Sequence, residues 1–362
     1  MPHSIQILVA ALLLAAAGCG PSAPPAPPAT APVPPQTNTA ADPVQPTTAA
    51  SPPSAAPSPA PPSAESGLAG LMARYLKSDE AGIWRPDEQA ATELEKLAPT
   101  AAQVLPLLAN PRVEVRRSAA FYWLGSFDPA APEQVAHFTK LLGDSDRTIR
   151  GIGLAAVKEL PAADQLAALP QLAEMLDPAR EDKADNRAAI ARLLGSLRAQ
   201  AAPGLPALLA AAKSDPDGKV RAAGLAAIAQ IAPAAEAIPP LTAGLADKDA
   251  AVKVVAAAQL RRLGPAAAPA AKELAAALSD ADQRVREAAT EALILIGAPA
   301  VEPLAGVLAG KSDEARKYAL VALGRIGPPA KAALPGIEKC LKDGDAATSR
   351  LAAQALKQIG PP

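Results

Sequence analysis

The sequence has few of the residues that most often carry out chemistry in proteins. Its 362 residues include two histidines, His3 and His137, and two cysteines, Cys19 and Cys340. This inventory does not supply the His and Cys ligands of a zinc site. The sequence also has no glycine-rich phosphate loop and no serine-elbow motif. We therefore expect no catalytic residue, no metal site and no cofactor, and we expect that the protein is not an enzyme.

Aromatic residues and net charge are equally low. Aromatic residues make up 2% of the chain, and 35 basic against 36 acidic residues leave a net charge of −1. Nucleic-acid binding favours a basic stripe, and the sequence has none, so we expect no nucleic-acid partner. Hydrophobic residues make up 50% of the chain and are mostly Ala and Leu. That content favours thin, closely packed helices over a thick globular core.

The amino-terminal residues have the pattern of an export signal. Residues 5–17 are apolar and too few to cross a bilayer as a helix. The segment from Ala16 to Cys19 resembles the lipobox of bacterial lipoproteins. The resemblance implies that residues 1–18 are removed and that Cys19 carries lipid, which anchors the protein to a membrane of the bacterial cell envelope, facing the periplasm or the exterior. An ordinary cleaved secretory signal and the absence of export are the alternatives.

A proline-rich segment follows. Residues 20–66 hold 16 of the 41 prolines, together with Ala, Ser and Thr, and only Asp42 and Glu65 carry charge. Such a composition cannot bury a core, so residues 19–66 are predicted to be a disordered linker. Its reach is between about 40 Å as a flexible coil and about 145 Å as an extended polyproline helix. A tether to a lipid anchor is the simplest use; a loose spacer or a proline-rich docking segment is the alternative.

From residue 67 onward the sequence repeats itself. A basic residue recurs at intervals of 30 to 37 residues, which we call position zero of each copy; it is Arg117, Arg150, Arg187, Arg221, Lys253, Arg286 and Arg316, with Ser349 in the last copy. Small residues occupy most +3 positions, and positions +7 and +10 are apolar, which defines one buried helical face. A helical period of this length is typical of a solenoid. We expect about eight copies between residues 67 and 362.

Each copy is predicted to contain two helices separated by an acidic turn. The first helix often opens with an apolar residue and Pro, as in Leu205-Pro206 and Ile238-Pro239. The turn then carries two aspartates that break the first helix and cap the second, as in Asp247-Lys248-Asp249. Cys340 matches apolar residues of the other copies and is predicted to be a core thiol. The turn at residues 177–186 is longer, and it either extends a contact surface or is a tolerated insertion.

Segments such as Leu278 to Ala289 and Ala322 to Gly327 resemble HEAT repeats, particularly the short class found in phycobilisome lyases. The resemblance implies an all-α, right-handed α-solenoid of eight to nine two-helix repeats over residues 67–362. It also implies a ladder of bonds in which each position-zero residue binds the turn aspartate of a neighbouring copy. Residues 68–99 fit poorly, with an insertion around Trp84, as is typical of a terminal capping copy. The iron-binding His-Glu pairs of the related deoxyhypusine hydroxylases are absent from the sequence.

Positions +1, +5 and +8 of the second helix are predicted to point outward and to form one ridge, on the side that is concave in HEAT-type solenoids. Seven of the eight aromatic residues lie between residues 75 and 138, so Tyr122 is expected to be an exposed anchor, although packing under the capping copy is the alternative for this cluster. The predicted partner-binding residues are Tyr122, Trp123, Lys158, Arg192, Arg261, Glu287, Glu291, Lys317 and Gln354.

Solenoids usually act by presenting an extended surface, so we expect a membrane-tethered scaffold of the cell envelope that binds an unidentified protein. We expect the protein itself to be monomeric. The alternatives are a passive structural spacer and, less favoured by the residues present, a HEAT-like enzyme related to the lyases or hydroxylases.

Overall fold

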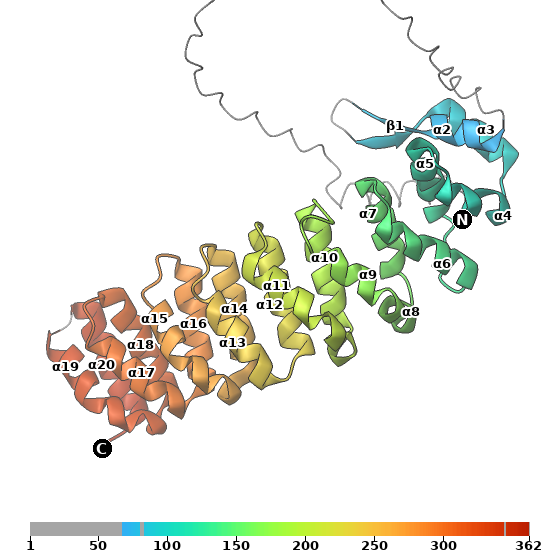
Figure 1. The fold of residues 1–362 in the computed structure, drawn as a ribbon. Coiled ribbons are helices and arrows are strands. Elements are labelled where there is room, and N and C mark those ends of the chain that lie inside the picture. Colours follow the sequence, from blue (N-terminus) through green and yellow to red (C-terminus); the bar gives the residue numbers. More distant parts are fainter. Residues whose placement is uncertain (1–66, 80–82, 344, 362) are drawn as a thin grey trace, which may run out of the picture. The chain divides into compact units, whose positions relative to one another are not determined.

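The computed structural model describes residues 67–79, 83–343 and 345–361 (Figure 1). The described residues belong to two compact units, which meet in sequence between residues 119 and 120. The predicted signal, residues 1–18 with the following Cys19, and the predicted linker, residues 19–66, lie outside the described residues.

The first unit contains the copy that fits the repeat poorly. Instead of a simple helix pair, it has an antiparallel ribbon between two helices, in which Lys77 pairs with Arg85. The predicted insertion around Trp84 is the second strand of this ribbon. The elements of this part are α2 (Leu68–Tyr75), β1 (Leu76–Ser78), β2 (Trp84–Pro86), α3 (Glu88–Leu97), α4 (Ala101–Val104), η1 (Leu105–Ala109) and α5 (Val113–Leu124), which continues into the second unit.

The ribbon packs on α5 through two contacts within the first unit. The Arg117 guanidinium lies 4.0 Å from the centre of the Trp84 ring, a cation–π contact. The backbone N–H of Leu76 donates to the hydroxyl of Ser118, at 3.2 Å. This small ribbon is the one departure from the all-helical prediction in the described chain.

The second unit consists of two-helix repeats, as predicted. Each second helix lies beside the second helices of the neighbouring repeats, and the first helices form another layer (Figure 1). The α-solenoid prediction is confirmed. The repeats contain α6 (Pro132–Lys140), η2 (Leu141–Gly143) and α7 (Arg147–Lys158); α8 (Ala162–Ala167), α9 (Leu169–Glu174) and α10 (Ala184–Ser196); η3 (Arg198–Gly204), α11 (Leu205–Ser214) and α12 (Gly218–Ile231); α13 (Ala234–Gly244) and α14 (Ala250–Leu263); η4 (Gly264–Ala270), α15 (Ala271–Ala277) and α16 (Gln283–Ile296); η5 (Ala298–Ala300), α17 (Val301–Leu308) and α18 (Asp313–Ile326); η6 (Pro328–Ala333), α19 (Leu334–Asp343) and α20 (Ala346–Ile359).

The helix boundaries follow from local signals. The second aspartate of each acidic turn caps the next helix; the Asp249 carboxylate, for example, accepts a hydrogen bond from the N–H of Ala251. Second helices end at glycines such as Gly297, whose φ of 77° is readily adopted only without a Cβ. One predicted boundary is wrong: Pro239 lies inside α13, which begins at Ala234, because the preceding turn of residues is already helical.

The core is the predicted stripe. All eight +3 residues are buried, and most +7 and +10 residues are buried with them. Cys340 is also buried, as predicted. The small +3 side chains let the helices approach closely; a Cβ added to Gly153 would lie 2.9 Å from the Cβ of Leu141.

Candidate functional site

The basic residue at position zero has a structural role that repeats along the solenoid. Arg187 donates from Nε and Nη2 to the two carboxylate oxygens of Asp215 in the next copy, at 2.7 and 2.8 Å. Arg221 makes the same pair of bonds to Asp247, at 2.7 Å each. The ladder that the resemblance implied is thus confirmed in the copies from Arg150 to Lys253, whereas Arg286 has no such ion pair with a described residue, because the next turn has Gly310 at the matching position. Its other members are Arg150 with Glu181 and Lys253 with Asp280.

Each arginine of the ladder also donates a hydrogen bond to the backbone of the turn in its own copy. Nη1 donates to a backbone carbonyl six residues earlier, and in Arg187 this bond to Glu181 is 2.7 Å long. The Arg221 guanidinium lowers the pKa of Asp247 below its ordinary value of 3.8, which keeps the pair charged. Because these groups are already hydrogen-bonded, the ladder stabilises the solenoid and offers little to a partner.

The ladder corrects the register of the first copy. There the bond to the carbonyl six residues earlier is made by Arg116, which donates to Asn110 at 2.9 Å, whereas Arg117 packs on Trp84. Position zero is therefore Arg116 and not Arg117. Tyr122 then falls at position +6, which faces the core in most copies; the later +6 residues include the buried Ala156, Ala227, Ala292, Ala322 and Ala355.

The predicted exposure of Tyr122 is accordingly wrong: only 5% of this residue is exposed. The five consecutive side chains from Ser118 to Tyr122 are all buried, so α5 has no solvent face at this level. The adjacent Trp123 is half-buried, and its indole N–H donates to the side-chain oxygen Oε1 of Gln134 at 3.0 Å. Packing within the protein, the alternative for this cluster, accounts for Tyr122.

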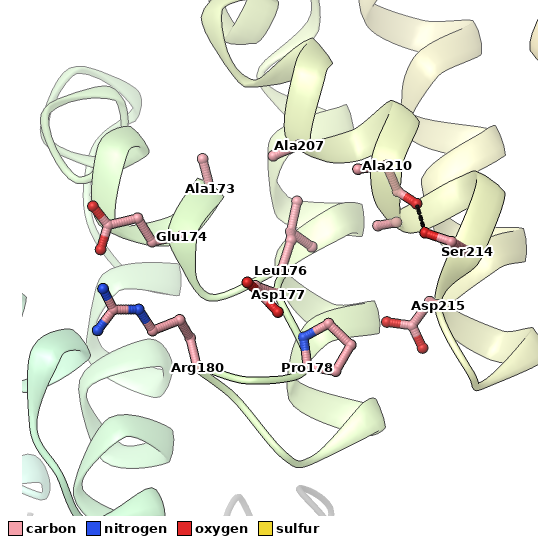
Figure 2. A pocket seen from close by; sticks show the side chains of 11 residues that line it. Ala173, Glu174, Leu176, Asp177, Pro178, Arg180, Ala207, Ala210, Ser214 and Asp215 are labelled. Atoms are coloured by element: carbon pink, nitrogen blue, oxygen red, sulfur yellow. Dashed lines mark hydrogen bonds between the residues drawn. The ribbon is translucent and has the colours of Figure 1, made fainter.

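The long turn after α9 is part of the ladder. Glu181 is completely buried, accepts from Arg150 at 3.1 Å and so occupies the place that an aspartate has elsewhere. Asp182 forms an ion pair with Arg147 at 3.3 Å. The turn also borders a hollow of about 600 Å³ between α9 and α11, with Arg180 at one side (Figure 2). The carboxylate of Asp215 lines this hollow, but it already forms an ion pair with Arg187.

Most of the other predicted partner-binding residues are exposed on the second helices, but those nearest the carboxyl end are already engaged. Glu291 of α16 forms an ion pair with Arg325 of α18. Lys317 lies 3.0 Å from Glu314 and 3.7 Å from Asp345. Glu287 accepts a hydrogen bond from Gln283, and the exposed Arg261 and Gln354 complete the predicted set.

Two predicted residues, Lys158 and Arg192, come together in a groove. The groove lies between α7 and α10, has a volume of about 530 Å³ and is reached by Lys219 from α12. Both side chains are exposed, and neither forms an ion pair with any residue of the described chain. We call this the α7/α10 groove; its lining is Gly151, Leu154, Ala155, Lys158, Glu159, Asp185, Asn186, Ala189, Arg192 and Lys219.

The base of the groove holds a residue that the sequence prediction missed. Asn186 is only 4% exposed, lines the groove, and has no side-chain hydrogen bond to any of the described residues. A signal for it was present, because its position immediately precedes position zero, where the other copies are apolar or have Thr. These residues are Val115, Ile149, Val220, Val252, Val285, Ala315 and Thr348, all of them buried.

The described residues contain neither a cluster that could hold a metal ion nor a membrane-spanning helix. In residues 67–79, 83–343 and 345–361, no group of three or more His, Cys, Asp and Glu side chains is placed to hold a metal ion. His137 is half-buried, with Nδ1 2.8 Å from the Glu133 carbonyl oxygen. None of the described helices is long and apolar enough to span a membrane.

Comparison with known proteins supports the repeat. The family model of HEAT repeats matches residues 205–294 and 238–321. No curated protein matches the chain. Among solved structures, importin β is similar over 75% of this chain with 15% identity and a TM-score of 0.51, and the chain spans 41% of that protein.

Two further structures are similar to the chain. One is YIBA of Escherichia coli, with 18% identity, a TM-score of 0.41, and coverage of 76% of this chain and 97% of that one. The other is an engineered protein with 20% identity, a TM-score of 0.44, and coverage of 80% and 88%. At these identities the importin β match shows the fold alone. The chain therefore contains HEAT repeats over residues 205–321 and has the α-solenoid fold.

Proposed function

We propose that the protein is a scaffold that binds another protein on the face formed by its second helices. The observation that carries this proposal is the α7/α10 groove, where Lys158 and Arg192 are exposed without an ion-pair partner in the described chain and the amide of Asn186 lines the groove without a hydrogen bond to a described residue. The ladder arginines Arg187 and Arg221, by contrast, are buried and already bound to aspartates, so they are not available to a partner. Extended solenoid faces suit protein partners, because neighbouring repeats build one continuous surface.

We further propose that the scaffold is tethered to a membrane of the bacterial cell envelope. The support is the lipobox-like segment ending at Cys19 and the proline-rich linker of residues 19–66. A linker of this length holds the solenoid away from the membrane surface and leaves its faces accessible. Labelling cells with a radioactive fatty acid tests this point: the label should enter the wild-type protein and be lost in Cys19→Ser, and an unlabelled wild-type protein would contradict lipid anchoring.

The binding proposal is tested by crosslinking the intact protein in its own membranes and capturing it. The informative variant is Lys158→Glu with Arg192→Glu, which reverses both free charges of the groove. The matched control, Lys213→Glu with Lys272→Glu, makes the same change in net charge at exposed positions of the first helices α11 and α15. A partner captured by the wild type and the control, and lost from the groove variant, is the expected result.

Equal capture of the partner by the wild type, the groove variant and the control would exclude the groove as the binding surface. Empty captures would favour the alternative of a passive structural spacer. Circular dichroism of each variant should be unchanged, because every substituted side chain is exposed.

A further inference from the structure

We propose that the α7/α10 groove binds an extended segment of the partner protein, with Asn186 bound to a main-chain amide and Lys158 and Arg192 bound to an acidic side chain of the same segment. This inference rests on the proposed scaffold function and names the chemistry of its partner. It follows from the floor of the groove, the spacing of its walls and the distribution of its charges.

The floor presents a polar group that the protein leaves unused. Asn186 is only 4% exposed as a residue, but its amide atoms are not fully buried, so they meet water in the groove, and a ligand with matching polar groups would replace that water. A Cβ at Gly151 would lie 3.7 Å from Nδ2 of Asn186, in contact with it, so a larger side chain there would cover the amide. The pairing of Asn186 with Gly151 thus leaves the amide open to the groove. An amide offers one donor group and one acceptor, which matches the C=O and N–H of a peptide backbone.

The walls are two helical stripes of small residues, each with a cation at one end. On α7 the stripe is Gly151, Ala155 and Lys158, and on α10 it is Asp185, Ala189 and Arg192. Both run at intervals of four and three residues, so each lies on one face of its helix.

This spacing sets the length of the segment. The cation at position 192 is six residues beyond Asn186, which is about 9 Å along a helix axis. An extended chain rises about 3.3 Å per residue, so the acidic side chain should lie about three residues from the bound main-chain amide.

The charges of the groove indicate a carboxylate at the end that holds Lys158 and Arg192. At the other end Asp185 forms an ion pair with Lys219 at 3.2 Å, so these two charges offset each other. The remaining lining charges are the two cations and the exposed Glu159, which leaves an excess of one positive charge. A single carboxylate complements that excess, and a basic segment would be repelled.

The test is selection of ten-residue peptides from a random display library on the full-length protein. Binding of the selected peptides is then measured by fluorescence anisotropy. We expect enrichment of peptides with Asp or Glu, and about tenfold or greater weakening when that residue is changed to Asn or Gln. Comparable weakening is expected for Lys158→Gln with Arg192→Gln, and also for Asn186→Val.

The control variant is Lys213→Gln with Lys272→Gln, which removes the same charge from the first helices and should bind the peptides as the wild type does. Asn186→Val introduces the residue that neighbouring copies carry at this position, as in Val220 and Val252, so folding should be retained. The exposed Lys158→Gln with Arg192→Gln variant tests the groove independently of the core.

The outcomes separate this inference from the proposed function. Peptides that bind the second-helix face without an acidic residue, or whose affinity is unchanged in the groove variants, would overturn the inference and leave the scaffold function standing. A library from which no peptide is enriched would count against the inference, and the membrane crosslinking experiment would then decide the scaffold function by itself.

Discussion

Replacing Asp215 by Asn should destabilise the solenoid strongly, because it breaks the most buried ion pair of the ladder. The side chains of Arg187 and Asp215 are 2% and 0% exposed. One carboxylate oxygen accepts from Arg187 Nη2 at 2.8 Å and from the N–H of Asp217 at 2.9 Å, and the other accepts from Arg187 Nε at 2.7 Å. An asparagine would remove the negative charge and direct an NH₂ group at a donor.

The expected magnitude follows from the burial of this pair. Removing one partner of a buried ion pair costs about 3–5 kcal/mol, since the remaining charge is left uncompensated. The control is Glu291→Gln, whose partner Arg325 is 50% exposed and whose own side chain is 41% exposed. An exposed pair contributes about 0–1 kcal/mol. Both substitutions replace a carboxylate by an amide, so the difference between their losses in free energy of unfolding isolates the effect of burial.

The assay is urea unfolding of the full-length protein, monitored by circular dichroism, together with amide hydrogen exchange. Hydrogen exchange is needed because a repeat array can open locally, and protection should be lost first in α10 to α12. Replacing both partners by apolar residues, Arg187→Met with Asp215→Leu, should recover much of the stability. A loss below about 1 kcal/mol for Asp215→Asn, or one equal to that of the control, would refute this account of the ladder.

Three further predictions concern single positions. Gly310 stands at the turn position that holds an aspartate in the ladder, and the buried Nε of Arg286 has no hydrogen-bond partner in the described chain. Gly310→Asp should supply that acceptor and raise the free energy of unfolding by about 1 kcal/mol, a gain reduced by the close approach of the new Cβ to the Val307 carbonyl oxygen, at 3.0 Å; an unchanged urea midpoint would contradict it. Asn186→Val should raise the same quantity by about 1 kcal/mol, because it replaces a 4% exposed polar side chain, which has no hydrogen bond within the described chain, by an apolar one; a loss of stability would contradict this reasoning. The pKa of Asp247 is lowered from 3.8 by Arg221, so its contribution is complete above about pH 4 and is lost as the pH falls through the lower, folded-state pKa. Asp247→Asn should therefore lessen the decline of stability below pH 4 in acid-unfolding titrations, and an identical decline in the variant would exclude this role.

The repeat period, the helix caps and the buried stripe could all be predicted from the sequence, because each depends on residues within one or two turns of a helix. Asp249 caps α14 through a hydrogen bond to a residue two positions away, and Leu293 is buried because its face of α16 is apolar. Such signals recur in every copy, so an error in one copy leaves the solenoid prediction unchanged. The lipobox-like segment and the linker remain predictions, since they lie outside the described residues.

The exposed and polar residues of the second helices depended on contacts that the repeat pattern does not contain, most of them between residues more than thirty positions apart. Glu291 is paired with Arg325, although periodicity alone predicts its charge to be free. In the first copy position zero is Arg116 and not Arg117, and this shift of one residue directs the side chain of Tyr122 into the core. Asn186 becomes a site because α7 places Gly151 opposite it. Local sequence therefore specifies which helical face is buried, whereas the packing of one repeat against the next decides which polar groups on the remaining faces are left for a partner.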